Sequence, residues 1–146
     1  MQLSRIVVLA ICFWLGGSFS KAVGVEAKGI KTPELKMTVT AYYKPLPNQK
    51  KYVKGSYKKD VKMNGSGKKT SSGSVPEEGT LAADKLIFPE GTVFHVPGFG
   101  RGTAKDTGGK IKGRRLDLFM GEGDAGREKA VAWGNKKIKV LIVSKL

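Results

Sequence analysis

Cysteine and histidine are nearly absent from this chain of 146 residues, which has one of each, Cys12 and His95. Cys12 lies inside an apolar N-terminal stretch, so removal of that stretch would leave a chain without cysteine. A disulfide framework is then excluded, and so is a zinc cluster built from cysteine and histidine. A domain of about 120 residues can bury an adequate core without either device. We therefore expect no metal and no cofactor.

Long apolar runs are also missing, apart from one near the N-terminus. Arg5 precedes the apolar run 6–15, and small residues follow at 16–18 and 20. A run of about ten residues is too short to span a bilayer comfortably. These features indicate a secretory signal peptide over residues 1–27, followed by a polar linker over residues 28–36. An uncleaved signal anchor is the alternative.

Acidic residues are scarce: 12 Asp and Glu stand against 27 Lys and Arg, which gives a formal net charge of +15. Loss of residues 1–27 removes Arg5, Lys21 and Glu26, one net positive charge, and leaves +14. An exported protein this basic is expected to meet an anionic surface, such as peptidoglycan stem peptides, teichoic acids or membrane headgroups. Export argues against nucleic acid as a partner, and the aromatic residues do not interleave with the basic ones as a stacking platform requires.

Short strands separated by glycine-rich turns dominate the chain after residue 36. The first, Met37–Tyr43, alternates with β-branched and aromatic residues. Further strands are expected at Leu81–Ala83, Thr92–Val96, Gly102–Lys105, Arg115–Met120 and Lys137–Val143. Such a pattern predicts an all-β domain over residues 37–146, folded as a small closed barrel.

Two other segments interrupt this pattern. Residues 124–133 are expected to form one short helix, capped by Asp124 and ended by Gly134. Residues 48–74 are rich in Lys, Gly, Ser and Asn and lack a helical period, so they predict a long surface loop with at most one short strand near Tyr52. A loop of this length in a compact domain is usually functional or mobile.

Three aspartates, Asp84, Asp106 and Asp117, stand at the ends of apolar runs rather than in charged loops. Asp106 and Asp117 flank a glycine-rich turn, and in a simple hairpin their Cβ atoms would lie roughly 5 Å apart. Two close carboxylates cannot both ionise easily, so one pKa rises, as a general acid requires. Paired carboxylates on either side of a scissile bond cleave glycosidic linkages. The alternative for Asp84 and Asp106 is that they accept hydrogen bonds from turn backbone.

An ordered series of motifs runs through the same region. Its members are Thr-Ala-Tyr-Tyr-Lys-Pro at 40–45, Gly-Lys-Lys-Thr-Ser-Ser-Gly at 67–73, Gly-Thr-Leu-Ala-Ala-Asp at 79–84, Pro-Glu-Gly-Thr at 89–92, Gly-Phe-Gly at 98–100, Asp-Thr-Gly-Gly-Lys-Ile-Lys-Gly-Arg-Arg-Leu-Asp-Leu-Phe at 106–119 and Ala-Val-Ala-Trp-Gly at 130–134. Over residues 37–146 this series resembles the 3D domain, named for its three aspartates. That domain occurs in membrane-bound lytic transglycosylase A and in the stationary-phase survival muralytic proteins.

The resemblance implies a double-psi β-barrel that cleaves peptidoglycan glycan strands in the periplasm or cell wall, with outer-membrane association as an option. It places the family's three aspartates at Asp84, Asp106 and Asp117 and makes Asp117 the catalytic one. We expect Asp117 to act as acid and then base, leaving 1,6-anhydro ends, with Asp106 and Asp84 as electrostatic and orienting partners. The alternatives are an inverting hydrolase, in which Asp106 activates water, and an expansin-like barrel that binds wall polysaccharide without cutting it.

Several other residues are candidates for binding the glycan. They are Thr40, Tyr42, Thr70, Ser71, Gly108, Gly109 and Lys112. The hydroxyl-bearing side chains would contact sugar, the lysine would bind muropeptide carboxylates, and the two glycines would supply a positive φ or close backbone approach. Core strand residues, a polar loop and a solvated lysine are the structural alternatives.

Overall fold

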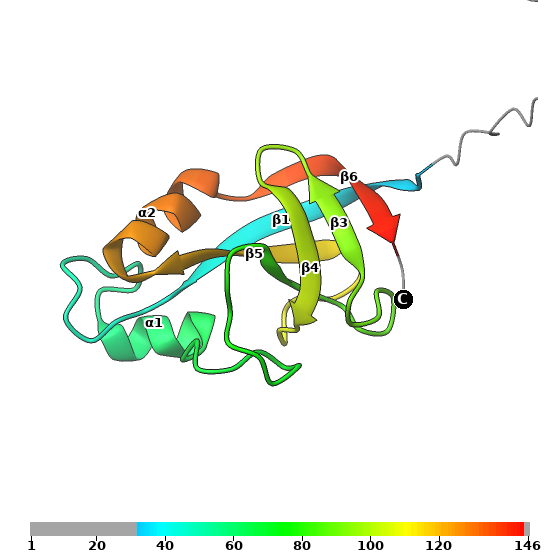
Figure 1. The fold of residues 1–146 in the computed structure, drawn as a ribbon. Coiled ribbons are helices and arrows are strands. Elements are labelled where there is room, and N and C mark those ends of the chain that lie inside the picture. Colours follow the sequence, from blue (N-terminus) through cyan, green and yellow to red (C-terminus); the bar gives the residue numbers. More distant parts are fainter. Residues whose placement is uncertain (1–31, 145–146) are drawn as a thin grey trace, which may run out of the picture. The chain divides into compact units, whose positions relative to one another are not determined.

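A computed structural model describes residues 32–144 (Figure 1). The expected signal peptide over residues 1–27 lies outside the described residues. Within them the strands are β1 Glu34–Lys44, β2 Thr80–Ala83, β3 Val93–Val96, β4 Gly100–Asp106, β5 Arg115–Glu122 and β6 Lys136–Ser144, and the helices are α1 Tyr57–Asn64 and α2 Gly123–Trp133. The domain is therefore mostly β-sheet, with two helices where one was expected.

The strands of the described region close into one ring in the order β1-β5-β2-β4-β3-β6. The pairs β1·β5 and β2·β4 are parallel, and the other four pairs are antiparallel. In Figure 1, β3 and β4 cross in front of β1 and β5, while both helices lie at the end of the ring where β1 and β5 finish. Ring closure leaves no sheet edge open to pairing with another chain.

Alternate strand residues fill the interior of the ring. β1 directs Met37 and Val39 inward, and β5 directs Leu116 and Leu118 inward. The core is completed by Leu81, Ala83, Phe88, Phe94, Val96, Ala104, Trp133, Val140 and Ile142. Because side chains alternate along a strand, the residues between these positions face outward. This alternation places the candidate site on the outer face of the ring.

β1 begins earlier than expected. Glu34 pairs with Leu141 and Leu35 with Val140 on β6, so residues 34–36 are strand rather than linker. Leu35 packs against the core. Glu34 and Lys36, on either side of Leu35, are exposed to solvent. Their polarity is the reason that the sequence predicted a linker here.

Helix α1 lies inside the segment that was expected to be a loop, so that expectation was wrong. Ser56 caps its N-terminus by accepting from Lys59 N at 3.4 Å, and Gly65 ends it with φ 82°. Its only buried residue is Asp60. That carboxylate accepts hydrogen bonds from Tyr43 Oη, Val53 N (2.8 Å) and Lys54 N (2.6 Å). Because the buried residue of this helix is a carboxylate, the sequence has no periodic pattern of apolar residues from which the helix could be predicted.

Helix α2 matches the expected helix, and Gly134 ends it with φ 69° as expected. Asp124 is not its cap, because the Asp124 carboxylate accepts from Lys50 N at 2.8 Å and Lys51 N at 3.0 Å. Those bonds tie the connection after β1 to the start of α2. Neither described helix is long and apolar enough to cross a bilayer.

Candidate active site

Four residues on neighbouring strands form one row across the outer face of the ring. Thr40 of β1 pairs with Asp117 of β5, Asp117 pairs with Ala82 of β2, and Ala82 pairs with Asp106 of β4. Residues paired in this way direct their side chains to the same face of a sheet. The ring therefore gathers two of the three aspartates from separate strands, with Thr40 beside one of them.

A β-bulge in β4 brings Asp106 into this row. Leu81 pairs with Ala104, but the next residue, Ala82, pairs with Asp106, so Lys105 is left as the extra residue. Without the extra residue, Asp106 would fall out of register with Ala82 and lie on the other face. The bulge is therefore a local device that turns the Asp106 carboxylate toward the site.

A simple hairpin would place Asp106 and Asp117 directly opposite each other. The structure does not contain that hairpin. β4 and β5 do not pair with each other, because β2 lies between them. Two strand spacings separate their Cα atoms by roughly 10 Å. The carboxylates are thus near enough to act on one ligand without being in contact.

Asp117 is partly buried, and its carboxylate accepts a hydrogen bond from Thr40 Oγ1 at 2.8 Å. Burial raises its pKa from an ordinary value of 3.8 to about 6, against the opposing effects of the Thr40 hydrogen bond and the Arg115 charge. The charge on Asp106 adds a smaller upward contribution. The mutual repulsion of two carboxylates is therefore the lesser cause, and removal from water is the main one.

Asp106 is held in one orientation by three donors. Its Oδ1 accepts from Ser71 N at 2.9 Å and from Thr107 N at 2.8 Å, and its Oδ2 accepts from Tyr42 Oη at 3.3 Å. Burial, followed by the charge of Asp106, raises the pKa of Tyr42 well above its usual value. Tyr42 is therefore a neutral hydroxyl donor at any physiological pH. Asp117 makes a smaller contribution to that shift, so the Tyr42 hydroxyl lies within reach of the charge on both carboxylates.

Asp84 has a different environment. Its Oδ1 accepts from Leu86 N at 3.1 Å and its Oδ2 from Gly113 N at 2.8 Å. These backbone hydrogen bonds hold the pKa of Asp84 below its usual value, with a smaller contribution from Lys112. Asp84 thus fastens the end of β2 to the connection between β4 and β5, the two strands that carry Asp106 and Asp117.

The structure brings some of the expected binding residues to the row and not others. Thr40 and Tyr42 contact the aspartates, and Ser71 does so through its backbone N–H. Thr70 is buried, and its hydroxyl is occupied by Ser72 and Ser74 in a tight turn, so it does not face a ligand.

The glycine turn also differs from expectation. Neither Gly108 nor Gly109 has a positive φ, whereas Gly113 does, at 65°. A Cβ on Gly108 would lie 2.9 Å from Ile111 Cγ1, so close approach does hold there, while Gly109 has open space around it. Lys112 is exposed and acts on Asp84 rather than on the row.

Pattern reasoning missed Asp60, and Arg115 acts on Asp117 in the structure. Arg115 lies two positions before Asp117 on the same face of β5, and its charge lowers the pKa of Asp117. Asp60 anchors α1 to Tyr43 of β1 and to the backbone of Val53 and Lys54, which precede the helix. A buried carboxylate inside a polar segment offered no sequence signal by which Asp60 could have been found.

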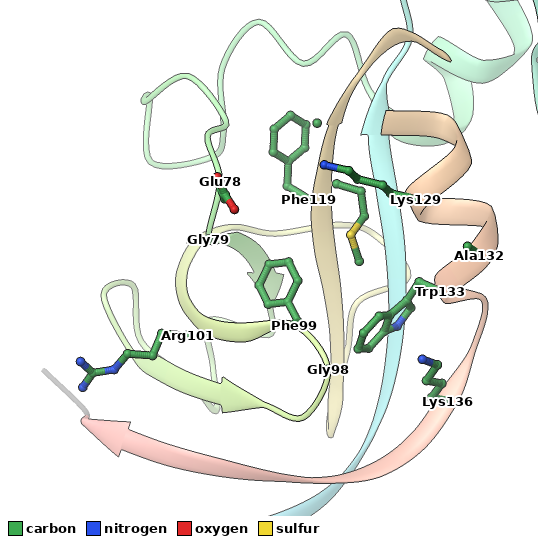
Figure 2. Close-up of a pocket in the computed structure, with 12 residues that line it drawn as sticks. Glu78, Gly79, Gly98, Phe99, Arg101, Phe119, Lys129, Ala132, Trp133 and Lys136 are labelled. Carbon is green, nitrogen blue, oxygen red and sulfur yellow. The ribbon is translucent and has the colours of Figure 1, made fainter. Parts of the chain in front are cut away.

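Two cavities flank this face. One of about 330 Å³ is lined by Tyr42, Asp106, Gly108 and the segment after α1. The other, of about 750 Å³, lies beyond Phe119 and contains no aspartate (Figure 2). Among residues 32–144, no group of three or more His, Cys, Asp or Glu side chains is placed to hold a metal ion.

The fold and site together define a small closed β domain with a carboxylate row on its outer face. The family model of the 3D domain matches residues 79–144. This match confirms, over residues 79–144, the resemblance drawn from the sequence.

Two curated relatives come from Bacillus subtilis strain 168. YabE, named as a candidate cell wall shaping protein, is 38% identical over 69 residues, which are 47% of this chain and 16% of YabE. The cell wall-binding protein YocH is 35% identical over 69 residues, 47% of this chain and 23% of YocH. The match thus spans less than a quarter of either relative.

Similar solved structures include the lytic transglycosylase MltA from E. coli. An apo form of an MltA variant has a TM-score of 0.46 and 25% identity, covering 53% of this chain and 27% of that one. MltA with bound chitohexaose has a TM-score of 0.45 and 26% identity, covering 53% of this chain and 28% of that one.

Proposed function

We propose that this protein is an exported enzyme that cleaves peptidoglycan glycan strands by lytic transglycosylation, with Asp117 as the acid and base. The observation that carries the proposal is the burial of Asp117, which raises its pKa to about 6 in a row that also holds Asp106. A carboxylic acid near neutrality is what a general acid needs. The named cell-wall roles of the two relatives support peptidoglycan as the substrate.

In the first step, protonated Asp117 donates its proton to the glycosidic oxygen. The bond from the anomeric carbon to that oxygen breaks, the leaving sugar departs as an alcohol, and positive charge develops on the ring. Thr40 hydrogen-bonds the Asp117 carboxylate at 2.8 Å, so it stabilises the ionised form that this step creates.

In the second step, the Asp117 carboxylate takes the proton from the C6 hydroxyl of the same sugar. The C6 oxygen then closes onto the anomeric carbon and leaves a 1,6-anhydro end. Asp117 is returned to its protonated form, and no water or covalent intermediate is consumed. A single carboxyl group with a raised pKa is therefore sufficient for the proton transfers.

Asp106 supports this chemistry from the other side of β2. Its negative charge stabilises the developing positive ring, and its three hydrogen bonds fix Tyr42 and the Ser71 backbone around the site. Asp84 holds the β4–β5 connection in place without contacting substrate. The roles thus divide into one proton-transfer residue, one charge-support residue and one positioning residue.

Two other functions have specific support. The roughly 10 Å between the Cα atoms of Asp106 and Asp117 leaves space for a water between carboxylates separated by about 6.5–9.5 Å, as inverting hydrolases require. The second is glycan binding without cleavage, which the name of the cell wall-binding relative supports.

We also propose the double-psi topology, export to the periplasm or cell wall, and anionic wall polymers as partners. Two parallel pairs within an otherwise antiparallel ring support the topology. The sequence over residues 1–27 and the charge of +15 support export and an anionic partner.

Digestion of purified sacculi with the mature protein tests the proposed reaction. Mass spectrometry of the released fragments should show 1,6-anhydro ends. Reducing ends would replace the transglycosylase with the hydrolase. Binding to sacculi with no release of fragments would replace the enzyme with the binding barrel.

A further inference from the structure

The larger cavity lies next to the carboxylate row. Phe119 lines the cavity and follows Asp117 by two positions on the outer face of β5, about 7 Å along the strand. Its ring packs against Tyr42 with 5.4 Å between centroids, and Tyr42 donates to Asp106. A ligand seated over the aspartates could thus extend past this aromatic pair into the cavity.

The aromatic residues of the cavity do not form a stacking platform for sugar. Trp133 is only 8% exposed, and its indole N–H donates to Val39 O at 3.2 Å. The Lys136 ammonium already covers its ring, 3.9 Å from the centroid. Phe99 meets Trp133 edge-on, with 75° between the rings. The aromatic residues therefore supply apolar wall rather than an open face.

Most of the charged side chains that line the cavity are positive. Lys129 from α2, Lys136 and Arg101 line it, against one acidic residue, Glu78. Figure 2 shows the Lys129 ammonium reaching over β5 toward Phe119 and Lys136 beside Trp133, while the Arg101 guanidinium points away. Each of the three cations lacks an ion-pair partner among the described residues. The cavity is thus suited to an anionic ligand with small apolar groups.

We propose that this cavity is a subsite for the carboxylate-bearing peptide that branches from a peptidoglycan glycan strand. Methyl groups of such a peptide would pack on Phe99 and Phe119, and a carboxylate would pair with Lys129 and Lys136. The volume of about 750 Å³ falls within the roughly 300–1,000 Å³ of ligand pockets. This subsite rests on the proposed function and adds a part of the substrate that would be bound outside the carboxylate row.

The test measures binding in an Asp117→Asn background, so that cleavage does not intervene. The probes are a purified disaccharide–tetrapeptide and a peptide-free chitotetraose, each titrated calorimetrically at low salt. The peptide-bearing probe should bind about tenfold more tightly. Lys129→Gln should remove most of that preference and leave chitotetraose binding unchanged.

Lys137→Gln is the matched control, because it removes the same charge from a neighbouring exposed position that does not line the cavity. Equal affinity for both probes, or equal losses in the Lys129 and Lys137 variants, would overturn the subsite. A retained preference in a protein that never cleaves sacculi would support the subsite and refute only the proposed reaction.

Discussion

Asp106 and Asp117 both lie opposite Ala82, one on each side of β2. The two carboxylates thus belong to strands that do not touch, and they act from either side of a buried alanine. Because of this separation, the two carboxylates have different hydrogen-bond partners and different access to water. Asp117 is removed from water beside Thr40, whereas Asp106 is saturated with hydrogen-bond donors.

Replacing Asp117 with Asn should abolish glycan release and also stabilise the fold at neutral pH. The folded-state pKa is raised, so the unfolding free energy of the wild type falls as pH rises from about 4 to about 6. At 1.36 kcal/mol per pKa unit, ionisation costs on the order of 3 kcal/mol.

Thermal unfolding of the wild type and the Asp117→Asn variant at pH 4 and pH 7 checks this. The two proteins should match at pH 4, and the variant should be more stable at pH 7. A variant that releases muropeptides at the wild-type rate would refute the acid/base role.

The rate of cleavage should fall above about pH 6, because the acid must be protonated to donate. In Asp106→Asn the fall should begin at lower pH, since removing a nearby negative charge lowers the pKa of Asp117. The rate itself should also decrease, through loss of charge support. Muropeptide release between pH 4.5 and 8 measures both effects, and an unshifted profile would show that Asp106 does not act on Asp117.

Thr40→Val should shift the same profile in the opposite direction. The Thr40 hydroxyl stabilises the ionised form of Asp117, so its loss raises that pKa further. Thr38→Val is the control, because Thr38 faces the same side of β1 but lies opposite Arg115. If both variants move the profile equally, the hydrogen bond is not the cause.

Asp84→Asn should lower the melting temperature more than it alters the pH profile. An amide can accept from only one of the two backbone donors, so either Leu86 N or Gly113 N loses its partner. Hydrogen exchange should increase over residues 107–114. A stable variant with a displaced pH profile would instead place Asp84 in the catalytic machinery.

The three aspartates, the strands and α2 could be located from the sequence because their signals are local. Alternating apolar residues predicted β5, and Gly134 predicted the end of α2. The sequence left open whether Asp84 accepts hydrogen bonds from turn backbone, and in the structure its carboxylate accepts from two backbone N–H groups. In α1 the local signal was absent, since its one buried residue is a carboxylate.

The sequence by itself thus determined the approximate positions of the strands and the carboxylates that lie on or beside them. Only the tertiary structure decided that β2 lies between β4 and β5, that the bulge at Lys105 turns Asp106 onto the row, and that Asp117 is partly withdrawn from water. The reason is physical. Strand propensity is a property of neighbouring residues, whereas pairing order and burial depend on contacts between residues far apart in the chain, and the pKa of a carboxyl group depends on that burial.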